Sequence, residues 1–316
     1  MNKRKSTLLK LGLFISFSTV AIHIINRMIS ASAVLKNLLN TKNGSYYKWR
    51  FGNVFYTKQG SGSPILLIHD LSPSSSAAEW ESVVDELSQN HTVYVIDLLG
   101  CGRSDKPPIT YTNFLYVQLL TDFANNVIGQ KPDVVASGLS GSFIVMACAH
   151  GEAAFGKIML INPADMSILN QIPSKTTKIA KYLLELPLLG TFVYNIITAK
   201  SNIELLFTEK YLYNPFSLSQ SVIDTYYESA HLNDGKYLLS SIIGKYIYFN
   251  ISHGLKSISN KVLVITGEHC QGGNEAIAQY SSLNKTLAHE IIPKTKFLPQ
   301  QEDPAQLISL ANIFFE

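Results

Sequence analysis

Short runs of consecutive apolar residues alternate with segments of helical periodicity along most of the chain. The apolar runs cover residues 65–68, 93–96, 134–136, 158–161 and 262–265. Continuous apolarity is typical of strands that are buried on both faces of a parallel sheet. Helical patterns lie between these runs, at residues 78–87, 113–128 and 142–149. The alternation predicts an α/β fold with a doubly wound, mostly parallel sheet, preceded by a hairpin over residues 46–51 and 54–57.

The alternation stops between residues 166 and 257. This segment carries amphipathic helical patterns, such as residues 176–184 and 219–231, and no convincing strand pattern. We predict a helical lid inserted between two parts of one core, residues 46–165 and 258–316. The active site of such a sheet lies beyond the carboxyl ends of its strands. The lid is rich in tyrosine and phenylalanine, which favours a small apolar acyl substrate or ligand.

The N-terminal segment, residues 1–33, combines basic residues with an apolar run. Lys3, Arg4, Lys5 and Lys10 precede or open the run at residues 8–25, which is near the length that spans a bilayer. We predict an uncleaved signal-anchor helix with a cytoplasmic N-terminus and the main domain outside. Residues 31–33, Ala-Ser-Ala, resemble a cleavage site, so secretion after cleavage is the alternative. Residues 34–45 form a linker.

Composition narrows the function further. The chain has 316 residues and a formal net charge of +3, which is too small to argue for nucleic acid as a partner. Its three cysteines show neither a zinc spacing nor a disulfide framework. No nucleotide-binding motif and no metal-ligand spacing occurs. We therefore expect no metal and no cofactor.

The candidate chemistry begins at residues 138–142, Gly-Leu-Ser-Gly-Ser, which follow a predicted strand and open a predicted helix. A sharp strand-to-helix turn with small residues beside a serine is typical of a nucleophile elbow. Ser140 is the predicted nucleophile, and Leu139 lies beside it. The N–H of Gly141, at the helix N-terminus, would stabilise an oxyanion.

Several motifs in order along the chain resemble the lidded epoxide-hydrolase, dehalogenase and esterase-like branch of the α/β-hydrolase superfamily. They are His69-Asp70, the stretch from Asp97 to Pro107 with its D-x-x-G-x-G-x-S-x-x-P pattern, the predicted elbow, Asn162-Pro163 and Gly267-Glu268. The resemblance covers residues 46–316. It implies that His69 is structural and that Leu71 N–H is the second oxyanion donor. Asp70 stands where the family has glycine, so it places a carboxylate near the oxyanion hole.

The resemblance also implies a catalytic histidine and a catalytic acid, and both positions are changed. Phe297 stands at the histidine position and Cys270 at the acid position. A serine needs a base to remove its proton, and His269 is the candidate substitute. His231 and His253 in or near the lid, and Asp165 as an acid, are further alternatives.

Two functions follow from these residues, and the sequence does not choose between them. The first is a membrane-anchored serine hydrolase that cleaves an apolar ester or related acyl substrate through Ser140. The second is a catalytically inactive protein of the same fold that binds a ligand or partner, because Phe297 and Cys270 replace the usual catalytic pair.

Overall fold

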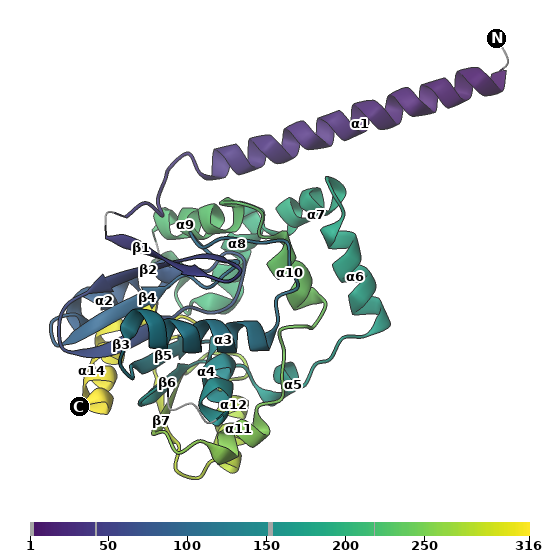
Figure 1. The fold of residues 1–316 in the computed structure, drawn as a ribbon. Helices are drawn as coiled ribbons and strands as arrows, with labels where there is room; N and C mark the ends of the chain where they lie inside the picture. Colours follow the sequence, from purple (N-terminus) through teal and green to yellow (C-terminus); the bar gives the residue numbers. More distant parts are fainter. Residues whose placement is uncertain (1–2, 42, 151–153, 218) are drawn as a thin grey trace.

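The structure is a computed structural model that describes residues 3–41, 43–150, 154–217 and 219–316. The side chains of residues 3–9, 11, 12, 15 and 217 lie outside this described part. Its centre is an eight-stranded sheet with helices on both faces (Figure 1). The strands are β1 (Gly44–Trp49), β2 (Gly52–Gln59), β3 (Ser63–Ile68), β4 (His91–Ile96), β5 (Asp133–Ser137), β6 (Ile158–Ile161), β7 (Val262–Gly267) and β8 (Ala288–Ile292).

The sheet order is β1-β2-β4-β3-β5-β6-β7-β8. The hairpin β1–β2 and the pair β2–β4 are antiparallel, and every later pair is parallel. The predicted mostly parallel sheet and its leading hairpin are therefore confirmed. Strand β8 was not predicted, because it is an exposed edge strand that contains His289 and Glu290.

Side chains of the central strands alternate between two cores. In β3, Ile65 and Leu67 face one core, while Leu66 and Ile68 face the other. Both sets are fully buried, which explains the continuous apolar runs. The first core is covered by α2 (Glu81–Leu87) and α14 (Pro304–Phe315), and the second mainly by α3 (Asn113–Phe123), α4 (Ser140–Ala149), α11 (Ser252–Ser257) and α12 (Gly273–Leu283).

The described residues between 166 and 257 form helices and no strand. We call this part the helical segment. Besides α11 it contains α5 (Met166–Leu169), α6 (Lys175–Glu185), α7 (Leu189–Ile197), α8 (Lys200–Leu206), η3 (Phe207–Tyr211), η4 (Pro215–Ser217), α9 (Gln220–His231) and α10 (Lys236–Ile243). The remaining short helices of the core are η1 (Ala77–Trp80), η2 (Ala124–Ile128) and α13 (Pro299–Glu302).

Helix α1 (Lys3–Ala33) precedes the sheet, and its C-terminal half packs against α7 and α9 (Figure 1). Asn26 joins it to this surface, because its amide donates to Leu188 O at 3.1 Å and accepts from Asn195 Nδ2 at 3.0 Å. Within the described residues, no helix is both long and apolar enough to cross a membrane, so the predicted transmembrane segment is not found. The described part of α1 has Lys10, His23 and Arg27 among its apolar residues.

Candidate functional site

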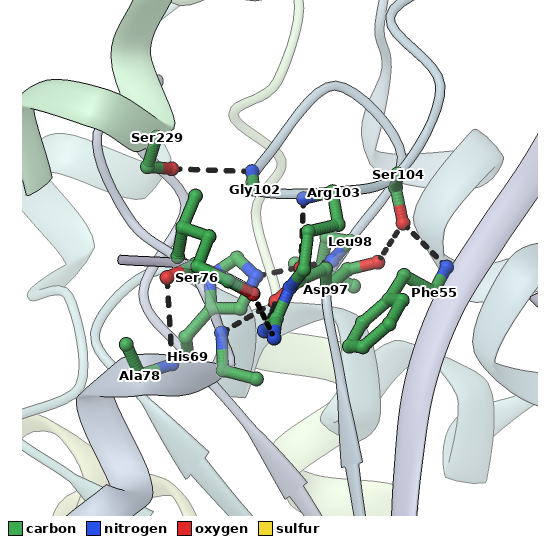
Figure 2. Close-up of polar contacts among 12 residues, drawn as sticks. Phe55, His69, Ser76, Ala78, Asp97, Leu98, Gly102, Arg103, Ser104 and Ser229 are labelled. Atoms are coloured by element: carbon green, nitrogen blue, oxygen red, sulfur yellow. Dashed lines mark hydrogen bonds and ion pairs between the residues drawn. The ribbon is translucent and has the colours of Figure 1, made fainter. Parts of the chain in front are cut away.

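Asp97, at the end of β4, organises the loop that carries the D-x-x-G-x-G-x-S pattern (Figure 2). Its buried carboxylate accepts hydrogen bonds from Arg103 Nε at 2.7 Å and Arg103 N at 2.8 Å. Burial alone would raise the pKa of Asp97, but the Arg103 guanidinium lowers it below its ordinary value. Ser104 Oγ donates to Asp97 O at 2.5 Å and accepts from Phe55 N at 2.8 Å. These hydrogen bonds fix the turn that follows β4.

His69 belongs to the same framework. Its Nε2 accepts from Leu98 N at 3.0 Å, so its Nδ1 carries the proton that is donated to Asp70 O at 2.7 Å. Burial lowers the pKa of His69, which keeps the imidazole neutral. Both ring nitrogens are used by backbone groups. His69 is thus a structural residue in this geometry, as the resemblance implied.

The helical segment is tied to this framework through Ser229 of α9 (Figure 2). Ser229 Oγ accepts from Gly102 N at 3.2 Å and donates to Ser75 O at 3.0 Å. The Lys106 ammonium donates to Ser229 O at 2.6 Å. These buried contacts fix α9 over the loops at the carboxyl ends of β3 and β4.

The strained strand-to-helix corner lies at Gly138, two residues before the predicted nucleophile. Gly138 directly follows β5, has φ of 55° and donates its N–H to Ile161 O at 2.9 Å. Ser140 has no positive φ and already belongs to α4. Since an elbow nucleophile occupies the strained corner, the nucleophile position of this fold holds glycine.

Ser140 itself is fully buried and does not line the cavity described below. Its Oγ donates to His69 O at 2.6 Å. Gly141 N points back into the turn, 3.4 Å from Gly138 O, and does not serve as an oxyanion donor. The structure therefore places Ser140, the predicted nucleophile, and Gly141, the predicted oxyanion donor, inside the turn and not on the cavity.

The Asp70 carboxylate occupies the space beside this corner. Leu139 N donates to Asp70 Oδ1 at 2.8 Å, and Leu71 N–H also stabilises the carboxylate. Leu139 follows the corner residue and Leu71 was the predicted second donor, so these are the two N–H groups that would hold an oxyanion. Burial raises the pKa of Asp70 to about 6, and the two N–H groups oppose that rise. The Asp70 carboxylate thus occupies the place that the resemblance assigns to an oxyanion.

A second buried acid, Glu79 of η1, lies behind Asp70. Its carboxyl accepts from Asp70 N at 3.2 Å and from Gln300 Nε2 at 2.8 Å. Burial, followed by the charge of Asp70, raises the pKa of Glu79 to about 8. Both pKa values are raised, and that of Glu79 is raised more, so Glu79 is the member of the pair whose protonated form the fold favours most.

The two positions that the resemblance assigns to the catalytic histidine and acid lie on the same cavity. Phe297 lines it and stacks on Tyr211 with ring centroids 5.2 Å apart. Cys270 also lines it, as a free thiol whose pKa burial raises to about 12. Neither side chain can act as a general base at neutral pH.

The other candidate bases lie elsewhere. His269 is about half exposed, stacks on Tyr213 at 4.6 Å and lies 3.5 Å from Glu268. His231 is buried on α9, where Nδ1 bonds Tyr227 O, and His253 is exposed on α11. None of these imidazoles lines the cavity with Gly138.

The cavity lies at the carboxyl ends of the parallel strands, between the sheet and the helical segment, and its volume is about 230 Å³. Its described lining includes Asp165, which was a candidate acid. Asp165 Oδ1 caps α5 by accepting from Ser167 N at 2.7 Å and Ile168 N at 3.1 Å. Asp165 and Asp70 are the charged side chains of this lining.

Two site residues escaped the sequence analysis. Gly138 could have been found by centring the elbow frame two residues earlier, where Ala136 and Ser140 supply the small flanking residues. Glu79 lies in a serine- and alanine-rich stretch with no pattern that predicts burial. Its role emerges only when η1 folds against the end of β3.

The sheet, the helical segment and the cavity together define a lidded α/β-hydrolase architecture. Residues 65–241, more than half of the chain, match the family described as "Alpha/beta hydrolase family". The chain belongs to the α/β-hydrolase family.

Individual similar proteins cover this chain to different extents. A 2-hydroxy-6-oxo-6-(2'-aminophenyl)hexa-2,4-dienoic acid hydrolase of Metapseudomonas resinovorans is 32% identical over 131 residues, which are 39% of this chain and 45% of that protein. The matched part is therefore less than half of that relative. The crystal structure of a serine hydrolase involved in carbazole degradation has a TM-score of 0.71 at 16% identity, covering 86% of this chain and 98% of that one. A membrane phospholipase A has a TM-score of 0.65 at 18% identity over 98% of both chains.

Proposed function

We propose that this chain is a non-catalytic member of the α/β-hydrolase family that binds a small ligand in the cavity beside Gly138. The observation that carries this proposal is the Asp70 carboxylate, which accepts the Leu139 N–H where an oxyanion would sit. An oxyanion could enter only if this charge moved away or was neutralised, because two negative charges in one such site repel each other.

The other reacting groups of a serine hydrolase are also replaced. Gly138 has no nucleophilic atom at the corner, and Phe297 offers no proton acceptor. Acyl transfer requires an activated nucleophile and a base within hydrogen-bond reach of it. The rival function is hydrolysis of an apolar ester through Ser140, in keeping with the hydrolase activity named for the similar proteins.

A fluorophosphonate probe and p-nitrophenyl esters distinguish these two functions. We expect no serine-specific labelling of the full-length protein and no ester turnover above that of the Ser140→Ala variant. Intact-mass spectrometry locates any adduct. Probe attachment at Ser140, together with turnover that Ser140→Ala abolishes, would establish the hydrolase and refute our proposal.

We also propose that the surface formed by α1, α6 and α7 rests on a membrane. Helix α1 and its neighbours α6 and α7 expose many large apolar side chains, which is typical of an interfacial surface. They are Leu13, Phe14, Phe17, Val20, Ile24 and Met28 on α1, Ile179, Tyr182 and Leu183 on α6, and Leu189, Val193, Ile196 and Ile197 on α7.

Vesicle sedimentation tests this second proposal. We expect the purified chain to sediment with vesicles of mixed neutral and anionic phospholipid. The double variant Phe14→Ser with Phe17→Ser should lose most of this binding, since these side chains are 69% and 74% exposed. Ile313→Ser on α14 is the matched control, because Ile313 is 72% exposed and α14 lies at the opposite end of the molecule from α1 (Figure 1). Equal loss in both variants would contradict a specific surface.

A further inference from the structure

All charged side chains in the described lining of the cavity beside Gly138 are acidic. This lining contains the carboxylates of Asp70 and Asp165 and no lysine, arginine or histidine. A ligand that carries negative charge would therefore meet two like charges in this cavity. The charge of the cavity favours a cation.

Asp70 has no cationic partner among the described hydrogen bonds and ion pairs. Its carboxylate is held by the N–H groups of Leu139 and Leu71, and the acid behind it is Glu79. The side chain lines the cavity and the residue keeps partial solvent exposure, so a ligand can reach it. A carboxylate in such surroundings gains most from a charge-assisted hydrogen bond to a bound donor.

The rest of the lining sets the shape and character of the ligand. Apolar and aromatic side chains share the lining with the carboxylate, and two of them, Tyr248 and Phe297, can also attract a cation through their ring faces. A volume of about 230 Å³ lies below the range of drug-sized pockets, so the ligand is small. The lining contributed by the helical segment and the elbow is Leu139, Ile168, Ile242 and Tyr248.

We propose that the cavity binds a small primary ammonium compound with an apolar body. The ammonium group would donate to the Asp70 carboxylate, and the apolar body would pack against Phe297, Tyr248 and Ile242. This inference rests on the proposed ligand-binding function and names the chemistry of the ligand. The charge preference of this cavity is then opposite to that of a hydrolase site, in which the N–H groups at the positions of Leu71 and Leu139 stabilise a negative oxygen.

Three probes of equal chain length test the charge preference on the full-length protein: n-hexylammonium, n-hexanol and n-hexanoate. Titrations at pH 7.5 are followed through the ¹H–¹⁵N resonances of Leu71 and Leu139, the amides that contact Asp70. We expect n-hexylammonium to bind at least about tenfold more tightly than n-hexanol, the size of one charge-assisted hydrogen bond. We expect n-hexanoate to bind weakest.

The variant Asp70→Asn keeps the size of the side chain and removes its charge. It should abolish the preference for n-hexylammonium over n-hexanol while n-hexanol still binds, which shows that the cavity remains folded. Asp85→Asn, an exposed carboxylate on α2, is the control and should leave the preference unchanged.

Equal affinity for n-hexylammonium and n-hexanol, or a preference that survives Asp70→Asn, would overturn the inference. Tightest binding of n-hexanoate would show an anion site and overturn it as well. Failure of all three probes would refute it too. Ester turnover through Ser140 would refute only the non-catalytic function, because these titrations measure binding in the absence of any reaction.

Discussion

The raised pKa of the buried Glu79 carboxyl predicts that the protein loses stability as the pH rises from 6 to 8, and the variant Glu79→Gln tests this. Glu79 is 1% exposed and its carboxyl bonds Asp70 N and Gln300 Nε2. Glutamine has the same size as a protonated glutamic acid. Rotation of the Gln300 amide would let its otherwise unpartnered oxygen accept from the new amide group. The substitution therefore keeps the packing and removes the titration.

The magnitude follows from the pKa difference between the folded and unfolded chains. The pKa of Glu79 is raised from 4.5 to about 8, so the folded state keeps a proton that the unfolded state has lost. Stability from this group is fully present below pH 4.5 and is lost as the pH rises toward 8. The slope is about 1.4 kcal/mol per pH unit, which gives a loss of about 2–3 kcal/mol between pH 6 and pH 8. The pKa of Asp70 is raised to about 6, so most of the stability that depends on its protonation is already lost below pH 6.

Urea unfolding followed by tryptophan fluorescence at pH 6 and pH 8 measures the effect, since Trp80 adjoins Glu79 in the buried η1 helix. We expect the free energy of unfolding of Glu79→Gln, relative to the parent, to rise by about 2–3 kcal/mol from pH 6 to pH 8. Glu81→Gln, an exposed neighbour, should give a difference that does not change with pH. Parallel pH profiles of the parent and Glu79→Gln would show that Glu79 does not hold the proton.

Three further outcomes follow from the site. Gly138→Ala should cost about 1–3 kcal/mol of unfolding free energy, because its Cβ would lie 2.1 Å from Asp70 Oδ1 at a positive φ, and Asp70→Gly should relieve part of this cost in a double-mutant cycle. Cys270 should react slowly with iodoacetamide at pH 8 in the native protein, since its pKa is raised to about 12, as mass spectrometry would show. Ser229→Ala should lower the free energy of unfolding by about 1–3 kcal/mol and speed hydrogen exchange of Gly102 N–H, because that buried donor loses its acceptor.

A different result would contradict each of these three predictions. Additive effects of Gly138→Ala and Asp70→Gly would mean that the two side chains do not compete for one space. Native alkylation of Cys270 as fast as in urea would show an exposed thiolate. Unchanged exchange at Gly102 in Ser229→Ala would show that α9 is not held through this contact.

Much of the fold followed from apolar periodicity, because the central strands are buried on both faces. Strand β8 did not, since an edge strand with exposed His289 and Glu290 lacks that signal. Flanking motifs aligned Phe297 and Cys270 with the catalytic positions of the family, and the structure places both residues on one cavity. The sequence predicted the strand-to-helix corner at Ser140, because the Gly-Leu-Ser-Gly stretch is conspicuous. The structure has the corner at Gly138, and its positive φ is visible only in the backbone.

The Asp70 carboxylate also bears on how such a protein could change over time. A serine at the corner would add a Cβ 2.1 Å from Asp70 Oδ1 and 2.9 Å from the Phe297 ring, so a side chain fits there only after those two neighbours shift. Removing the Asp70 side chain frees that space but leaves the N–H groups of Leu139 and Leu71 without their acceptor. Each single substitution at this corner thus carries a cost of its own. We therefore expect Asp70 and Gly138 to be replaced together rather than one at a time.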